Sequence, residues 1–407
     1  IPVLVAVGRE VKHGKDASID YKVEFREKEA PLSIGEDEDV DFHEMNLIVN
    51  VMVDEILAEK IPATKGETGV NILGQPVAAR DGKDIELKGG ENTSLTPDGM
   101  ALKAGANGHA ILAGGLINVK PVFEITGDVG PATGNITNMG SVVVMGNVLD
   151  GYNVKAAGNI EVKRSVGNCL IEATGDITIK LGVNGKNGGK IISQSGSLHA
   201  KFLQDVQVKV ANDVIVNESI IHSNVDSAGR VILMGKKAGI VGGKIRALSE
   251  VKARTIGSPG NVKTVIEVGV PPEIREGLET IATRITQSEP QITTLKLDIT
   301  TLKQQRLDEE KEKILKETEE KYNTLLAQLQ EDKAHLGQLQ DILAQSPVNG
   351  TVTFTKALYT GVVLACNTGN LENKRDQSSP SEITVDENNR EYVKFTPYKV
   401  TRGSHSR

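Results

Sequence analysis

Aromatic residues are scarce in this chain, and tryptophan is absent. Phe, Trp and Tyr together make up 3% of the 407 residues. Enzyme pockets are usually lined by aromatic and other apolar side chains. The shortage therefore argues against an enzyme built around a large apolar pocket.

An excess of basic residues is also missing. The 47 Lys and Arg are outnumbered by 54 Asp and Glu, which gives a formal net charge of −7 and a pI of about 5.7. A nucleic-acid-binding protein normally presents a basic face, with aromatics that stack on bases. We therefore expect no nucleic-acid ligand, and the acidic balance also disfavours anionic lipid surfaces.

Cysteine is nearly absent, since Cys169 and Cys366 are the only two. Two thiols so far apart in sequence provide neither a disulfide framework nor a zinc site. We interpret both as buried, inert thiols of a protein in a reducing compartment.

Long apolar runs are missing as well. No run approaches the roughly 20 residues that a membrane-spanning helix needs, and no signal peptide opens the sequence. We expect a cytoplasmic protein without membrane insertion. Ile1–Val7 already reads as a strand, which is compatible with a missing native segment before it. Residues 401–407 are expected to be a cloning remnant outside the fold.

Glycine, by contrast, is abundant, with 42 residues. Between residues 127 and 270 a short pattern recurs, in which Gly and a small polar or charged residue precede an apolar–x–apolar pair. The copies are about 16 to 21 residues apart, close to one coil of a β-solenoid and too short for a helix pair. The spacing predicts a single-stranded parallel β-helix over 127–270. The copies begin at Gly140, Gly158, Gly175, Gly196, Asn212, Gly229 and Ser249.

The alternation within each copy predicts which side chains face the interior. Successive side chains of a strand point to opposite faces. The residues expected to point inward and stack are Ile160, Ile177 and Val214. Those expected to point outward are Glu161, Thr178 and Ile215.

Two further expectations concern the corners of the coils. The Gly or Asn that opens each copy is expected to supply the positive φ of a sharp bend. The longer interval around Leu181–Lys190 predicts a bulged loop.

Residues 271–345 follow a helical period instead. Leu278–Leu302 and Leu315–Leu343 carry apolar residues at spacings of three and four, which is a heptad seam. Polar residues occupy three seam positions, Ser288, Thr318 and Asp332. The pattern predicts two helices that fold back on each other as an antiparallel coiled-coil hairpin.

Two positions shape this predicted hairpin. Pro290 is expected to kink or interrupt the first helix, and the charged run Asp308–Lys313 suits an exposed turn. Because alternating, strand-like sequence resumes after Gln345, the hairpin is expected to be an insertion into β structure.

The flanking regions read as β structure and loops. Residues 1–126 form a predicted N-terminal β-rich domain, and 346–400 are expected to return as C-terminal strands to the β-helix. The acidic run Glu36–Asp41 lacks the Gly turn and terminal Glu of a calcium loop, so we interpret it as a solvated loop. Residues 367–390 are polar and predict a loop.

Motifs that would carry chemistry are incomplete. The stretches ending Lys190-Ile191 and Lys244-Ile245 resemble a phosphate-binding loop, but Ser or Thr must follow the Lys to hold magnesium. The histidines show no metal-binding spacing, and acidic residues near the corners are ordinary turn formers: Asp176, Asp205, Asp213 and Asp226. We assign no catalytic, cofactor-binding or metal residue, and the sequence does not identify the protein-binding residues.

At this point the sequence resembles a known family. The matching parts are Ile61–Asp84, the coils from Gly127, Gly134–Val148, Lys236–Ala247 and Ile256–Ser258, followed by a helical hairpin and terminal strands. In this order they resemble the flagellar assembly protein A (FapA-like) family over nearly the whole chain.

The resemblance implies a cytoplasmic bacterial protein without known enzymatic activity. Such proteins are linked to flagellum assembly and, in some bacteria, to organisation at the cell pole, and a sugar phosphotransferase-system component is an implied regulatory partner. The family offers no catalytic residues to carry over. The chain departs from it in the polar segment 367–390 and in Asn212, where Gly is usual.

These observations predict a mainly β protein that acts as a non-enzymatic scaffold. It is expected to bind proteins of the flagellar or polar machinery as a homo-oligomer. One alternative is a β-helix enzyme acting on a polysaccharide, which paired carboxylates on successive coils would favour. Another is a filament-forming structural protein, which uncapped solenoid ends would favour.

Overall fold

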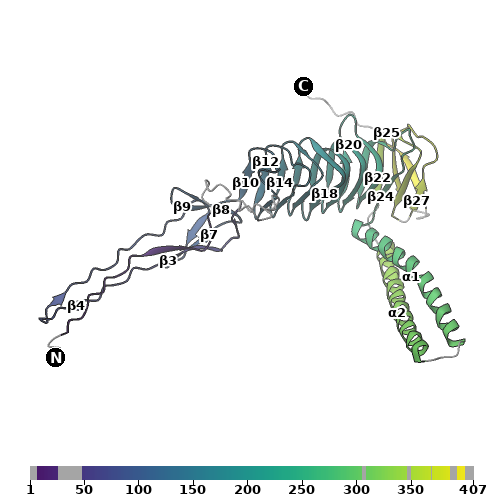
Figure 1. The fold of residues 1–407 in the computed structure, drawn as a ribbon. Coiled ribbons are helices and arrows are strands. Elements are labelled where there is room, and N and C mark those ends of the chain that lie inside the picture. The colour runs from purple at the N-terminus through teal and green to yellow at the C-terminus, as the bar shows by residue number, and fades with distance from the viewer. Residues whose placement is uncertain are drawn as a thin grey trace, which may run out of the picture. The chain divides into compact units, whose positions relative to one another are not determined.

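The computed structural model of the chain describes residues 7–25, 48–304, 309–345, 350–367, 369–385 and 392–398. The fold is mainly β, with a parallel β-solenoid of about eight turns and two packed, inserted helices (Figure 1). It comprises two compact units, Ile1–Lys180 and Leu181–Arg407, which are taken in turn. The acidic run 36–41 and the tail 401–407 lie outside the described residues.

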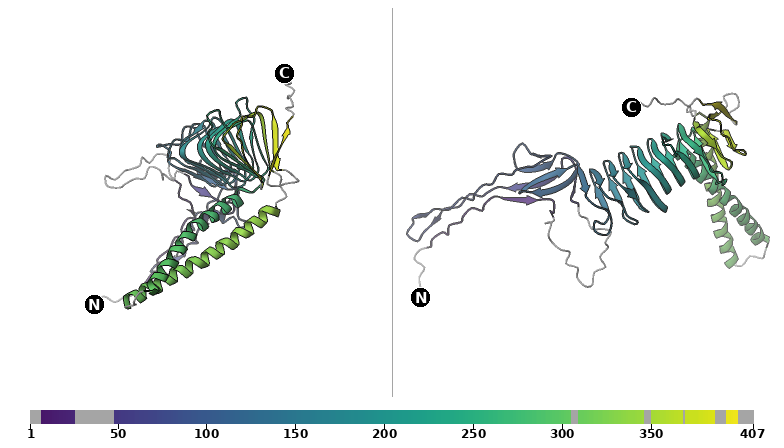
Figure 2. Two further views of the ribbon diagram at one scale, coloured as in Figure 1. Left: turned by 90° about the vertical axis from the view of Figure 1, so that its right-hand side faces the viewer. Right: turned by 90° about the horizontal axis from the view of Figure 1, so that it is seen from above.

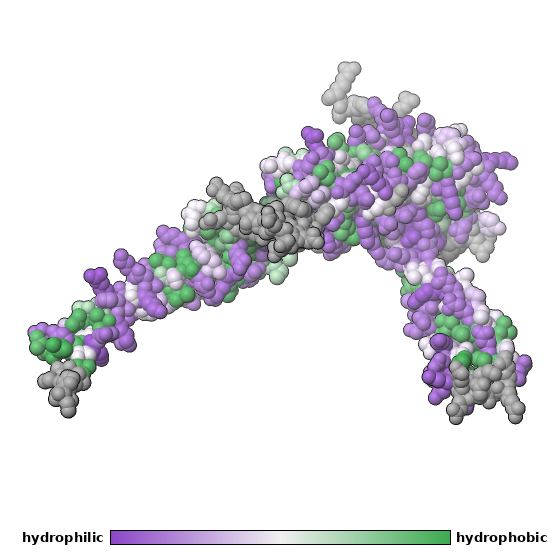
Figure 3. Space-filling view, in the orientation of Figure 1, coloured by the Kyte–Doolittle hydropathy of each residue, from purple (hydrophilic) through white to green (hydrophobic). Residues whose placement is uncertain are grey.

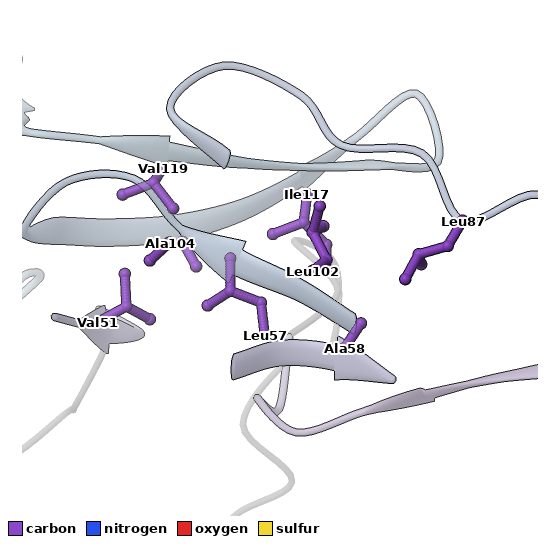
Figure 4. Packing of buried hydrophobic residues seen from close by; sticks show 9 residues of the cluster. Val51, Leu57, Ala58, Leu87, Leu102, Ala104, Ile117 and Val119 are labelled. Atoms are coloured by element: carbon purple, nitrogen blue, oxygen red, sulfur yellow. The ribbon is translucent and has the colours of Figure 1, made fainter. Parts of the chain in front are cut away.

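The first unit opens with a lobe of two small antiparallel sheets. One sheet has the order β1-β3-β7-β6 and the other β2-β8-β9. Their strands are β1 (Ser18–Tyr21), β3 (Ile56–Ile61), β7 (Ala101–Ala104), β6 (Thr93–Leu95), β2 (Asn50–Val51), β8 (Gly108–Ala113) and β9 (Leu116–Lys120). Leu57, Leu102 and Val119 belong to the small aliphatic core of the lobe (Figure 4). The predicted β-rich character of this region is thus observed.

An arm of three extended segments, residues 8–17, 62–70 and 76–84, belongs to the same unit. It includes the short strands β4 (Gly69–Val70) and β5 (Pro76–Val77). Backbone bonds join the segments: the Gly14 amide donates to the Arg80 carbonyl at 2.8 Å, and the Gly82 amide to the Thr64 carbonyl at 3.0 Å. Ala17 and Gly69 are the only buried residues of the arm. Backbone hydrogen bonds, and not an apolar core, hold it together.

The coils of the first unit are made of short parallel strands. They are β10 (Val122–Ile125), β11 (Ile136–Asn138), β12 (Ser141–Val144), β13 (Val154–Ala156), β14 (Ile160–Val162), β15 (Ser165–Val166), β16 (Leu170–Ala173) and β17 (Ile177–Ile179). Parallel pairing begins at Val122, opposite Ser141, upstream of the predicted start at Gly127.

Three rows of buried residues run up these coils, one for each side of a turn. The rows are Ile136–Val154–Ile171, Val142–Ile160–Ile177 and Val129–Val148–Val166. Ile160 and Ile177 lie opposite each other and are 1% and 0% exposed, whereas Glu161 and Thr178 reach the surface. The predicted register of these strands is confirmed.

The repeat glycines serve a different purpose from the predicted one. Gly140, Gly158, Gly175 and Gly229 do not have positive φ. A Cβ on Gly158 would lie 2.9 Å from the Ser141 amide nitrogen of the preceding coil. Glycine is required there because coils approach each other closely, so the expectation of a left-handed corner at each repeat was wrong.

The second unit is built of coils of the same kind with longer strands. They are β18 (Gly182–Ser193), β19 (Leu198–Val210), β20 (Val214–Ser227), β21 (Arg230–Leu233), β22 (Gly239–Ala247), β23 (Glu250–Ile256), β24 (Thr264–Val268), β25 (Thr351–Leu358) and β26 (Val362–Cys366). Figure 2 shows strands of successive coils lying side by side. The stretch predicted as a bulged loop, 181–190, lies almost wholly within β18. Its pairing with β19 shifts register between Asn184 and Gly189, so a bulge is present but within a strand.

Buried aliphatic rows again mark three sides. They are Leu198–Val214–Val231–Val251–Val352, Ile191–Val208–Val225–Ile245–Ile266–Leu364 and Val183–Leu203–Ile220–Ile240–Ile256–Leu358. Val214 faces inward and Ile215 is partly exposed, as expected.

The two helices interrupt the coils between β24 and β25. They are α1 (Pro272–Gln304) and α2 (Glu309–Gln345). α1 runs through Pro290 without interruption, so the interruption expected at this residue is absent. Glu309–Lys313, expected to lie in an exposed turn, begins α2 instead. After the helices, β25 pairs in parallel with β23, and β26 with β24. The predicted insertion is confirmed.

The last described strands close the C-terminal end of the coils. β27 (Gly369–Glu372), β28 (Ser381–Val385) and β29 (Val393–Pro397) pair antiparallel, to β26, to β25 and to β28 respectively. Two parts of the segment predicted as a polar loop, Gly369–Glu372 and Ser381–Val385, therefore form strands. In the described part of the chain, neither helix is apolar enough to cross a membrane.

Candidate protein interface

A groove of about 460 Å³ lies in the second unit beside the start of α1. Its floor comes from β18, β19, β20 and β22, and one wall from Glu276 of α1. The polar residues lining it, hereafter the groove residues, are Lys190, Gln207, Lys209, Asn224, Asp226, Lys244, Arg246 and Glu276.

Coil register places these side chains in two outward rows. Lys190 lies opposite Gln207, Gln207 opposite Asn224, and Asn224 opposite Lys244. This is the first row, with a cation at each end and two amides between. The second row runs alongside it and contains Lys209, Asp226, Arg246 and Glu267.

Arg246 is the centre of the second row and is only 9% exposed. Its Nε lies 3.6 Å from Asp226 and 3.5 Å from Glu267, and its Nη2 donates to Glu279 of α1 at 3.0 Å. The buried Nε itself has no hydrogen-bond partner in the described chain, nor has Nε of Arg275. A buried guanidinium surrounded by three carboxylates thus anchors the base of α1 through charge.

Burial also acts on Asp226. Removal from water raises the pKa of its carboxyl group, which the positive charge of Arg246 opposes and the negative charge of Glu276 reinforces. Asp226 is the next-to-last residue of β20. Its carboxylate balances the charge of Arg246.

Two surface ion pairs fasten α1 to the same face. Lys244 Nζ donates to Glu279 at 2.6 Å, and Lys209 Nζ lies 3.6 Å from Glu276. Exposed pairs of this kind contribute about 0–1 kcal/mol each. The groove face of the coils is therefore joined to the hairpin by several charged contacts, most of them open to solvent.

The hairpin itself packs along the predicted seam. Ile281, Ile292 and Leu329 are buried apolar residues of the described part of the hairpin. Asp332, one of the polar seam positions, is 6% exposed and pairs with Arg284 of α1 at 3.0 Å. An ion pair between a buried seam carboxylate and a half-exposed arginine favours one register of the two helices.

Two further ion pairs between the helices show how α1 and α2 run relative to each other. Lys303 near the end of α1 contacts Glu319 near the start of α2 at 2.7 Å, and Glu289 contacts Lys333 at 2.8 Å. The packing is therefore antiparallel. The hairpin surface is largely hydrophilic, with hydrophobic residues scattered on it (Figure 3).

The remaining sequence candidates stay apart. Asp213 pairs with Arg230, whose hydrogen bonds lower the pKa of the Asp213 carboxyl group. His222 lies 3.8 Å from Asp205. Within the described ranges, no three His, Cys, Asp or Glu residues gather as a metal site would require.

Both cysteines are buried, as expected. Burial raises the pKa of each thiol, Cys169 and Cys366, to about 12. Reactive cysteines need a depressed pKa, so these two have the properties of packing residues.

Sequence reasoning missed the groove. It considered Lys190 and Lys244 only as ends of two unrelated phosphate-loop look-alikes, and it did not single out Lys209 or Arg246. Their alignment depends on coil register, which follows from strand lengths and a bulge. The available signal was the recurrence of Gly-Gly-Lys-Ile, which lies within β18 and again within β22.

Comparison with protein families covers both parts of the fold. Residues 121–390 match the Flagellar Assembly Protein A beta solenoid domain, and residues 1–115 match the Flagellar Assembly Protein A N-terminal region. The chain belongs to the flagellar assembly protein A family. No curated protein and no solved structure matches it. The part of the chain that matches the beta solenoid domain contains the groove, the helical hairpin and β27–β28.

Proposed function

We propose that the chain is a non-enzymatic scaffold that holds other proteins during flagellar assembly. The observation that supports this most is the insertion of the hairpin. The coils pair in register on both sides of it, β23 with β25 and β24 with β26. The solenoid is therefore complete without the hairpin, which is an added contact element on a stiff body.

The hairpin carries apolar side chains outside its own seam. Leu297 is 63% exposed, Ile314 45% and Ile342 51%. Exposed aliphatic residues on a polar helical surface are contact points for another protein. We infer that they bind a partner or a second copy of the chain, and that the seam packs as a coiled coil.

Location and partners follow from the proposed role. A protein of the flagellar or polar machinery acts in the cytoplasm, and in some bacteria at the cell pole. A sugar phosphotransferase-system component is a regulatory partner in this proposal, and the scaffold works as a homo-oligomer.

Deletion of the hairpin tests the proposal. Residues 271–345 are replaced by a short Gly/Ser linker, and motility of the native host is scored with this variant as its only copy. We expect far-UV circular dichroism to lose helix and keep a cooperative β transition, while motility is lost. Normal motility with the deletion would contradict the proposal, and an insoluble product would show that the hairpin is part of the core.

A second variant keeps the experiment decisive if the deletion misfolds. Leu297→Asp and Ile342→Asp together change only exposed side chains, so the fold should persist. Reduced motility with unchanged melting supports a contact role. As a matched control, Lys316→Asp alters charge at a described, exposed hairpin position and should leave motility unchanged.

The filament alternative is disfavoured by the closed C-terminal end. β27, β28 and β29 run antiparallel to the coils there, so the last coil does not present a free parallel edge for a second molecule.

A further inference from the structure

The first outward row of the groove has the spacing of an extended peptide. Lys190 and Lys244 are three coil steps apart, which at about 4.8 Å per step is roughly 14 Å. In an extended strand, residues i and i+4 point to the same side and lie roughly 13 Å apart. Two carboxylates at i and i+4 would therefore meet the two lysines together.

The middle of the row supplies what a peptide backbone needs. Gln207 and Asn224 lie between the two lysines. Each side-chain amide carries donors and an acceptor. The Asn224 oxygen already accepts from the Lys244 backbone amide at 3.2 Å, so Asn224 can donate its NH₂ to a peptide C=O, while Gln207 can bond a peptide N–H or C=O. This combination fits an acidic peptide better than a lipid headgroup, which has no regularly spaced backbone groups.

An open cation of the groove favours an acidic occupant. Lys209, Lys244 and Arg246 are already paired with carboxylates of the coils and of α1. Lys190 is exposed and forms no ion pair with any residue that the structure describes. Such a cation at the end of the first row attracts a carboxylate of an acidic segment.

We propose that the groove binds an extended acidic segment of a partner protein, with two carboxylates four residues apart on Lys190 and Lys244. The proposal rests on the protein-binding function proposed above and names one of its surfaces.

The hairpin supplies an internal competitor for this segment. Glu279 of α1 already accepts a hydrogen bond from Lys244 Nζ, at 2.6 Å. An incoming carboxylate must take its place, so binding of the segment weakens one of the charged contacts that hold α1 on the coils. Removal of the Glu279 charge should therefore strengthen binding.

The test uses the full-length protein and a fluorescein-labelled heptapeptide, Thr-Glu-Thr-Val-Thr-Glu-Thr, followed by fluorescence anisotropy at low salt. We expect saturable binding that weakens as salt rises. Control peptides carry Gln for both Glu, or place the two Glu three residues apart and hence on opposite sides of the strand. Both should bind at least about tenfold more weakly.

Three variants locate the site. Lys190→Glu should weaken binding about tenfold, since it replaces an attraction by a repulsion. Glu279→Gln should strengthen it about two- to fivefold. Lys201→Glu makes the same charge change on β19 outside the groove, next to Glu218, and should have no effect.

The outcomes separate this proposal from the proposed function. Absence of binding, equal binding of all peptides, an equal effect of Lys201→Glu, or tighter binding of RNA or anionic vesicles through Lys190 would overturn the groove assignment. The hairpin-deletion experiment would still stand. Conversely, specific peptide binding together with normal motility of Lys190→Glu and hairpin-deleted cells would retain the groove and overturn the role in flagellar assembly.

Discussion

The coils and the arm both hold extended backbone segments together, but they do so by different interactions. Both bring extended segments close together, and both use glycine where a Cβ would collide with the adjacent segment of the same chain. The examples are Gly158 in the coils and Gly82 in the arm. The coils add rows of fully buried aliphatic residues, and the arm has none. Backbone pairing can therefore shape an extended element without a core.

The two regions should differ sharply in stability. Burial of an aliphatic side chain contributes about 1.5–3 kcal/mol, and each coil buries several. A backbone hydrogen bond contributes only about 1 kcal/mol net. At the end of the arm, Ile72 and Leu73 are 70% and 78% exposed and add no burial. The arm should open locally long before the coils unfold.

The largest expected effect comes from the coil interior. Ile177→Ala removes a side chain that is 0% exposed and leaves a cavity between coils, which should cost about 2–5 kcal/mol. Ile72→Ala in the arm should change the free energy of unfolding by less than about 0.5 kcal/mol. Urea unfolding followed by circular dichroism measures both. Similar losses would show that the apolar rows do not dominate.

A smaller effect is expected where coils touch through glycine. Gly158→Ala forces a Cβ to 2.9 Å from the Ser141 amide and should cost about 1–3 kcal/mol as overpacking does. Gly127→Ala is the matched control, because no atom lies within 4 Å of its Cβ position and its φ is not positive. Alkylation of the buried Cys169 reports opening of this region and should accelerate only in Gly158→Ala.

In the arm the same substitution should act locally. The Cβ of Gly82→Ala would overlap the Lys15 carbonyl and lie 3.0 Å from the Asp16 amide nitrogen. We expect the arm amides of Gly14 and Thr64 to lose protection from hydrogen exchange, while the coil transition shifts by less than about 0.5 kcal/mol. A global loss as large as that of Gly158→Ala would mean that arm and coils unfold together.

The smallest effect is a pH dependence of the lobe that joins the arm. Burial lowers the pKa of His109, which is 8% exposed and stacks edge-on against Phe123. The unfolded chain therefore takes up the proton first, and stability present above pH 6.5 is lost as the pH falls below it. Calorimetry at pH 7.5 and about pH 5.5 should show this loss. His109→Leu should reduce it, and substitution of His199 should not.

Sequence reasoning predicted the parts of the fold that depend on periodicity. The alternation around Ile160 and Ile177 and the heptad spacing of α1 and α2 are local patterns, and burial follows from them directly. The role of the repeat glycines was misjudged, because the constraint comes from the preceding coil and not from the residue's own backbone.

The groove and the arm could not be predicted in this way. Lys190 and Lys244 meet in one row only because two intervening coils keep register, and Gly14 bonds to Arg80 across a long stretch of sequence. Neither contact leaves an apolar pattern behind. Polar contacts between distant residues depend on a register that the amino-acid order alone does not display.

The insertion of the hairpin also affects the order in which the chain can fold while it is being synthesised. Roughly 80 residues separate β24 from β25, and a ribosome adding about 5–20 residues per second needs several seconds to make them. Throughout that interval the coil formed by β23 and β24 presents unpaired backbone edges to the crowded interior of the cell. The hairpin, whose contacts lie close together in sequence, can fold as soon as it emerges. The backbone edges of β23 and β24 thus stay unpaired until β25 and β26 have been synthesised.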